Sequence, residues 1–232
     1  MVEKTKLTRA GIIALTSPFR WIVAMGTIYL IASGSIDILR AWAYIGVYIA
    51  GSLVSGILLV KKVPGLLNQR GKIQEGTNKL DKCLILIYFL FAIVVTPLIA
   101  GLDYRFGISP LPFYFLYIGI GLYFVSLVFS IWPMFHNPFF EGTVRIQKDR
   151  DQKVIESGPY SIVRHPGYLG MLIGSLPLPF VFGSLLSFMP VSIMISLVFI
   201  RTYYEDRVLQ GGLEGYTGYC QRTKYRLIPL VW

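Results

Sequence analysis

The stretch that decides the fold is the uncharged run HPGYLGMLIGSLPLPFVFGSLLSFMPVSIMISLVFI, residues 165–200. A single helix over these 36 residues would extend about 54 Å, far beyond a hydrocarbon core of about 30 Å. Helix-breaking residues stand near its middle: Pro177, Pro179, Gly183 and Ser184. The run therefore predicts a tight helical hairpin, with one helix over 167–181 and a second over 184–204.

The rest of the chain is equally apolar. Of its 232 residues, 54% are hydrophobic and only 15% are charged, and four further uncharged stretches precede the hairpin. We expect spans over 21–36, 41–60, 83–102 and 113–134, the last broken near Pro133. The first span should stay in the mature protein, because the residues before it do not resemble a cleaved signal. The predicted fold is an all-α integral membrane protein with about six transmembrane helices.

The basic residues behind the net charge of +10 are distributed as this topology predicts. With six spans, all of the 22 lysines and arginines except Arg40 and Arg105 fall on the side that holds both termini. The positive-inside rule then places both termini in the cytoplasm. The positive charge is thus explained by membrane orientation and the lipid bilayer, and we expect no nucleic-acid partner. The sequence contains no indication of an oligomeric state.

Two polar segments complete the predicted organisation. EGTVRIQKDRDQKVIESGPYSIVRH, residues 141–165, predicts a small cytoplasmic cap, either a strand hairpin or an irregular structure with a turn at KDRDQ. The tail after Gly212 places tyrosines among basic residues, which is typical of an amphipathic helix at a membrane surface. We expect an N-terminal region of four helices over 1–137 and a cofactor-binding, catalytic region over 138–232.

Charged residues flank both ends of the predicted hairpin. Arg164 and His165 precede it, while Arg201 and Glu205 stand four residues apart at its far end and share a helix face. Each pair has an ordinary interpretation, as a membrane anchor or as a surface ion pair. Because antiparallel helices bring their outer ends to one depth, we expect the two pairs to line one cytoplasm-facing site. His136 has no evident partner in the sequence.

These residues also carry a family resemblance. GPYSIVRHPGYLG (158–170), RTYYEDRVL (201–209) and GYTGYCQRTKYRLIP (215–229) together resemble the C-terminal region of the isoprenylcysteine carboxyl methyltransferases and their phospholipid-methyltransferase relatives. The resemblance covers residues 153–229 and implies S-adenosylmethionine as cofactor. Here the acidic pair is Glu205-Asp206, where that family usually has two glutamates.

The resemblance implies roles for individual residues. Arg201 would be the substrate-side arginine, and with Glu205 it forms the expected catalytic pair. The expected cofactor-binding residues are Gln152, Lys153, Val154, Ile155, Tyr160, His165, Pro166, Gly167, Tyr168 and Glu205. No metal ion is expected. The acceptor would be a lipophilic small molecule or a prenylated substrate.

Physical chemistry is consistent with these roles. Methyl transfer is an in-line displacement, so catalysis consists mainly of alignment in a dry site. A carboxylate nucleophile is already ionised at neutral pH and needs a positioned cation, which a guanidinium provides with two-point geometry. An amine nucleophile would instead have to lose a proton, and Glu205 or His165 would then act as the general base.

We therefore expect an S-adenosylmethionine-dependent membrane methyltransferase, with carboxyl O-methylation of an isoprenylcysteine-like acceptor favoured. Phospholipid N-methylation is the first alternative. The second is an NADPH-dependent reductase of the sterol or steroid type, because those enzymes share a similar R-H-P-x-Y stretch. The third is a transporter or non-catalytic scaffold, although transporter sites usually lie near mid-bilayer.

Overall fold

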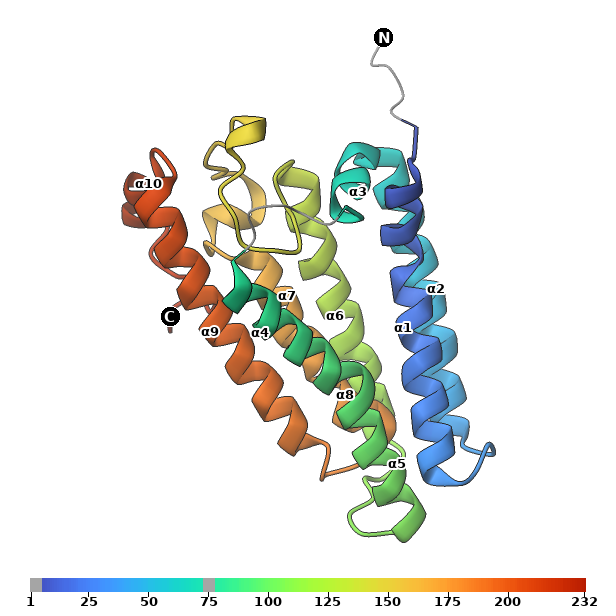
Figure 1. The fold of residues 1–232 in the computed structure, drawn as a ribbon. Coiled ribbons are helices and arrows are strands. Elements are labelled where there is room, and N and C mark those ends of the chain that lie inside the picture. Colours follow the sequence, from blue (N-terminus) through green and yellow to red (C-terminus); the bar gives the residue numbers. More distant parts are fainter. Residues whose placement is uncertain (1–5, 73–77) are drawn as a thin grey trace.

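The computed structural model describes residues 6–72 and 78–232, so Lys4 of the charge pattern lies outside the described residues. Within these ranges the chain is helical and forms no strand. Four helical segments are long and apolar enough to cross a membrane. They are α1 (Arg9–Ser33), α2 (Leu39–Lys62), the third span built from α4 (Lys79–Leu90), η1 (Phe91–Val95) and α5 (Thr96–Phe106), and α6 (Phe115–His136). The protein is thus an all-α integral membrane protein (Figure 1).

Helix α1 begins twelve residues earlier than the predicted start of the first span. Thr8 caps it by accepting a hydrogen bond from Gly11, and Gly34 ends it in the left-handed conformation. Arg20, which the prediction treated as a boundary, lies inside the helix and donates to the Thr16 hydroxyl and the Ile13 carbonyl. The prediction was wrong because an arginine can satisfy its donors on its own helix.

The third and fourth spans each contain a proline without a break. Pro97 follows the π-helical turn η1, which adjusts the backbone where the proline cannot donate a hydrogen bond. The expected break of α6 near Pro133 does not occur, because the helix continues to His136 and the Asn137 N–H caps it by donating to the Pro133 carbonyl at 2.9 Å.

The predicted hairpin is confirmed. It consists of α7 (Pro166–Ser175) and α8 (Pro177–Phe182), followed by α9 (Phe188–Gly212), which packs back against α7. Gly183 makes the turn with φ of 75°, a conformation that favours glycine. The Ser184 hydroxyl donates to Asp103 of α5 and so ties the turn to the third span. Helix α9 extends eight residues beyond the predicted end at 204.

The cap is the irregular alternative, with 3-10 turns at Lys148–Arg150 and Gly158–Ser161 and no strand pairing in the described residues. The prediction of an amphipathic surface helix is wrong for most of the tail. Helix α10 covers only Tyr216–Arg222 and buries Tyr216 and Tyr219. The chain then folds back along α9, where Trp232 contacts the Phe199 ring at 5.2 Å between centroids.

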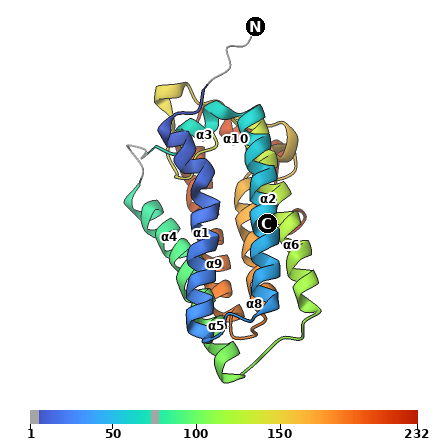
Figure 2. The same ribbon diagram turned by 90° about the vertical axis from the view of Figure 1, so that its right-hand side faces the viewer.

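One element was not predicted. The short helix α3 (Pro64–Arg70) follows α2 and packs on the start of α1 (Figure 2). Asn68 accepts from the Thr8 N–H at 2.9 Å and donates to the Lys6 carbonyl at 3.0 Å. Gly71 lies so close to the Ala10 carbonyl that a Cβ at this position would be only 1.8 Å from its oxygen. Helix α3 is therefore held rigidly at this end of the bundle.

The helices diverge toward the end that carries α3, the cap and α10. Figures 1 and 2 show α5 beside α1, whereas α4 leans away from α1 toward that end. The ring centroids of Trp21 on α1 and Phe89 on α4 lie 4.7 Å apart, at the level where the two helices converge. This divergence leaves room for a cavity inside the bundle.

Candidate functional site

A cavity of about 690 Å³ lies between α1, α2, α4, α6, α7, α9 and the cap. Pockets of about 300–1,000 Å³ hold most small-molecule ligands. All of the site residues expected from the sequence line it: Gln152, Lys153, Val154, Ile155, Tyr160, Arg164, His165, Pro166, Gly167, Tyr168, Arg201 and Glu205. Far apart in sequence, the two ends of the hairpin thus meet at one cavity, although the role of each residue stays a prediction.

The cavity is polar near the cap and apolar deeper in the bundle. Its polar end includes the cap segment 152–155, and its deep end reaches Tyr44, Tyr48 and Met194. A polar ligand and an apolar chain can therefore share one continuous space.

Arg164 and His165 do not face Glu205, as the sequence suggested, but its neighbour Asp206. Arg164 makes a two-point contact with Asp206, with its Nε and Nη2 at 2.8 and 3.0 Å from the two carboxylate oxygens. His165 Nε2 lies 3.2 Å from the same carboxylate. Burial alone would lower the pKa of Arg164, but the hydrogen bonds and charge of Asp206 raise it overall.

Asp206 also joins α9 to the C-terminal tail. The Tyr216 hydroxyl donates to it at 3.1 Å and Arg226 Nε at 2.8 Å, and its side chain is fully buried. A buried carboxylate is stable only when its charge is balanced and its lone pairs are hydrogen-bonded, which Asp206 achieves through these partners. The cluster fixes the backbone that carries His165 at the cavity wall.

Arg201 is also paired, and its partner was not anticipated. Its Nε donates to Asp81 at 2.8 Å, and Nη2 donates to the Gly142 carbonyl at 3.2 Å. The guanidinium lies 5.0 Å from the Tyr168 ring centroid, within range of a cation–π contact. Arg201 therefore lines the cavity with its charge already balanced, and it does not form the i,i+4 ion pair with Glu205.

Glu205 remains available for a ligand. Its carboxylate accepts a hydrogen bond from the Tyr168 hydroxyl. Within the described ranges, no lysine, arginine or histidine lies within ion-pair distance of it. A half-buried carboxylate without a cation partner, facing a cavity, suits a ligand that brings hydroxyl or ammonium donors.

Tyr160 is positioned from both ends. Its hydroxyl accepts from Asn137 Nδ2 at 2.9 Å, and its carbonyl accepts from the Tyr219 hydroxyl at 2.6 Å. Burial raises the pKa of Tyr160, because the phenolate would lose its hydration, so the side chain stays neutral. His136, which had no assigned partner, accepts from the Trp132 indole N–H at 3.2 Å.

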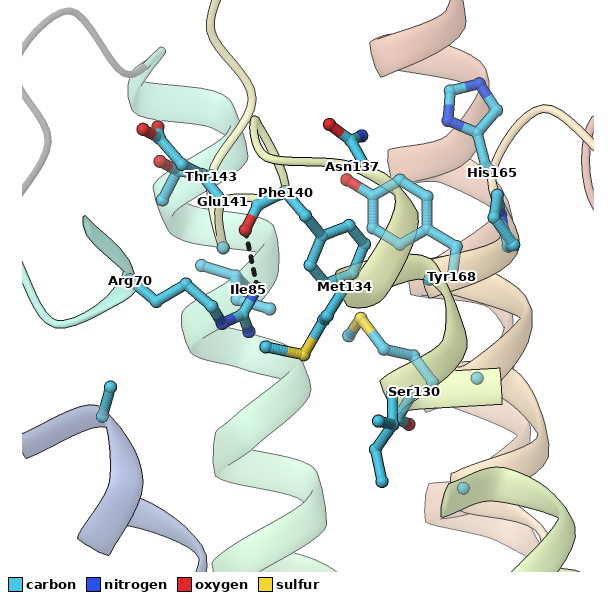
Figure 3. Close-up of a pocket in the computed structure, with 18 of the residues that line it drawn as sticks. Arg70, Ile85, Ser130, Met134, Asn137, Phe140, Glu141, Thr143, His165 and Tyr168 are labelled. Atoms are coloured by element: carbon cyan, nitrogen blue, oxygen red, sulfur yellow. Dashed lines mark hydrogen bonds between the residues drawn. The ribbon is translucent and has the colours of Figure 1, made fainter. Parts of the chain in front are cut away.

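Sequence reasoning missed two charged residues near the cavity. Asp81 was treated as lying outside the third span, although an acid beside an apolar run is a signal of functional or structural pairing. Arg70 was counted only as part of the positive charge, yet it lines the cavity (Figure 3). Among the described residues, no group of three or more His, Cys, Asp or Glu side chains is arranged to hold a metal ion.

Comparisons with known proteins bear on this same region. Residues 114–213 match the family model of the phospholipid methyltransferases. The match begins just before α6 and ends after α9, so it includes the cap and the hairpin. That family belongs to the same membrane methyltransferase superfamily as the isoprenylcysteine carboxyl methyltransferases. The match supports the predicted resemblance to membrane methyltransferases in general, without selecting the isoprenylcysteine family.

A second similarity is to a reductase. The chain is 33% identical over 99 residues to the Delta(14)-sterol reductase TM7SF2 of Mus musculus. The aligned part is 41% of this chain and 24% of the mouse protein, so the chain spans about a quarter of that relative. The similarity is in line with the reductase alternative raised by the sequence.

Proposed function

We propose that this protein is a membrane methyltransferase that uses S-adenosylmethionine and acts on a lipophilic acceptor. The observation that carries the proposal is the meeting of the predicted cofactor residues at one cavity, within the segment that matches a methyltransferase family. Carboxyl O-methylation of an isoprenylcysteine-like acceptor is the favoured reaction.

The cavity's polar end suits the cofactor. S-adenosylmethionine supplies an electrophilic methyl group on a sulfonium, together with hydroxyl, ammonium and carboxylate groups. Glu205 offers a carboxylate that has no cation partner among the described residues and accepts a hydrogen bond from the Tyr168 hydroxyl. The backbone of 152–155 and the face of Tyr160 would complete this part of the site. We propose that region 138–232 binds the cofactor while 1–137 supplies most of the acceptor's apolar surroundings.

Arg201 takes a modified role in this proposal. Because Asp81 balances its charge, Arg201 acts on the substrate side chiefly as a positioning group that holds the Tyr168 ring at the cavity wall. Displacement at the methyl carbon depends on alignment, so a rigid support beside the reacting groups contributes directly to rate.

The test is transfer of tritiated methyl from S-adenosylmethionine by the purified protein in lipid nanodiscs. N-acetyl-S-farnesylcysteine and phosphatidylethanolamine serve as acceptors in separate reactions. Base-labile tritium on the farnesylcysteine would support carboxyl O-methylation, and base-stable tritium on the phospholipid would support N-methylation. No transfer to either acceptor would contradict the favoured function and its first alternative.

The second candidate is an NADPH-dependent sterol-type reductase, favoured by the identity to the mouse enzyme. It predicts saturable NADPH binding and consumption of NADPH with an unsaturated sterol. We place it second because the family model that matches residues 114–213 is that of methyltransferases.

A further inference from the structure

Arginines on the cavity wall differ in whether a carboxylate neutralises them. Arg145 pairs with Glu141, Arg164 with Asp206 and Arg201 with Asp81. In the described part of the chain, the two other arginines on this wall, Arg20 and Arg70, have no acidic group within ion-pair distance.

Arg20 is exposed and satisfies its donors on its own helix. Arg70 is different. Its Nη1 donates to the Phe140 carbonyl at 3.2 Å, the one side-chain hydrogen bond that Arg70 makes within the described residues, and its guanidinium lies 5.0 Å from the Phe140 ring centroid. Several of its donors therefore remain free at the cavity.

The surroundings of Arg70 are apolar on the cavity side. Figure 3 shows its guanidinium between Ile85, Met134 and Phe140, with Tyr168 and His165 on the opposite side of the pocket. Burial lowers the pKa of Arg70, because desolvation disfavours the charged form, yet an arginine remains protonated. A desolvated cation with free donors strongly favours an anion that completes its hydrogen bonding.

Glu141 is the acidic side chain whose charge acts on Arg70, and other arginines already occupy it. Glu141 accepts from Arg145 at 2.9 and 3.1 Å, and Arg150 lies 3.6 Å from it. Rearrangement of Arg70 toward Glu141 would compete with both of these contacts. The rigid attachment of α3 to α1 through Asn68 and Gly71 also fixes the base of the Arg70 side chain.

We propose that Arg70 binds the oxyanion of the acceptor, a carboxylate or a phosphate carried by a lipophilic molecule. This inference rests on the proposed function, because it takes the ligand to be the methyl acceptor. It assigns to Arg70 the recognition of the acceptor's charge, which Arg201 cannot supply while it is bound to Asp81. The apolar deep end of the cavity would then hold the acceptor's hydrocarbon chain, and the opposite wall would hold the cofactor.

Direct binding tests this without relying on methyl transfer. The full-length protein in nanodiscs is titrated with N-acetyl-S-farnesylcysteine, with its neutral carboxamide, and with hexadecyl phosphate. The variants are Arg70→Gln, Arg70→Lys, which keeps the charge, and Lys72→Gln, a matched control from an exposed position two residues away. Thermal unfolding of each variant checks that it is folded.

We expect wild type to bind at least one of the two acids tenfold or more tightly than the carboxamide. Arg70→Gln should abolish that preference, Arg70→Lys should keep part of it, and Lys72→Gln should match wild type. The acid with the larger Arg70-dependent effect identifies the oxyanion as carboxylate or phosphate.

The inference is overturned if wild type shows no preference for either acid, or if Arg70→Gln keeps the preference. It is also overturned if Arg70→Gln instead weakens S-adenosylmethionine binding, which would place Arg70 on the cofactor's carboxylate. Absence of methyl transfer by wild type would contradict the proposed function, whereas these binding results would still decide the role of Arg70.

Discussion

Arg201 on α9 and Asp81 on α4 form a buried ion pair with 2.8 Å between Nε and Oδ1, although 120 positions separate them in the chain. Arg201 is 1% exposed and Asp81 is fully buried. The pair joins the third span to the second helix of the hairpin at the edge of the cavity. Asp81 also accepts from the Val144 N–H at 2.9 Å, so it connects the cap to the same point.

Removal of the Asp81 charge should therefore destabilise the folded protein strongly. Asp81→Asn leaves the Arg201 charge buried without compensation, and breaking such a pair typically costs about 3–5 kcal/mol. Thermal unfolding in detergent should show a clear loss of stability, and the exposed Asp37→Asn should behave like wild type. The double variant Asp81→Leu/Arg201→Met should be more stable than Asp81→Asn. Equal stability of Asp81→Asn and wild type would contradict the account of this pair.

Glu205 and Arg201 should have separable effects. Glu205→Gln should weaken S-adenosylmethionine affinity about tenfold or more, because a charged hydrogen-bond acceptor is lost from the pocket. Arg201→Ala, which also leaves Asp81 without its partner and is therefore checked for folding by thermal unfolding, should abolish methyl transfer and leave the cofactor affinity of the folded protein within a few-fold of wild type. Equilibrium binding and the tritium assay measure the two effects, with the exposed Glu214→Gln as control. The opposite pattern would show that the two roles are exchanged.

The Asp206 cluster should control the order of the C-terminal tail. Asp206→Asn weakens the attachment of Arg164, Tyr216 and Arg226, because each hydrogen bond to a charged group is worth about 1.5–3 kcal/mol. We expect trypsin to cleave within 222–226 several times faster than in wild type, with fragments read by mass spectrometry. An unchanged cleavage rate would mean that the tail is held by its apolar contacts, such as Trp232 on Phe199.

The hairpin also predicts accessibility across a membrane. In a variant without Cys83 and Cys220, single cysteines at Ser157 and Glu214 should react with an impermeant maleimide from the same side. A cysteine at Ile108, in the exposed connection between α5 and α6, should react from the opposite side. Labelling in sealed vesicles of known orientation makes the measurement. Reaction of positions 157 and 214 from opposite sides would exclude the shared cavity.

Much of this architecture was predictable because it depends on local signals. The 36-residue run at 165–200 was too long for one crossing and had breakers in its middle, so the meeting of His165 with the region of Arg201 followed from geometry alone. The start of α1 was missed because Arg20 resembles a boundary until its hydrogen bonds to its own helix are known.

Side-chain pairing was not predictable in the same way. Whether Arg201 reaches Asp81 depends on the rotation of α9 against α4, and the apolar runs of these helices contain no sequence pattern that fixes this rotation. The same applies to Arg70, whose importance comes from what lies around it rather than from a motif. The tail was misread because its tyrosines could cover either lipid or protein, and only packing against α9 decides between them.

The most direct test of the central claim is isothermal titration of the purified protein with S-adenosylmethionine and, separately, with NADPH. We expect saturable binding of S-adenosylmethionine that is weakened about tenfold by Glu205→Gln, and no saturable binding of NADPH. Saturable binding of NADPH with none of S-adenosylmethionine would contradict this expectation and would favour the reductase alternative.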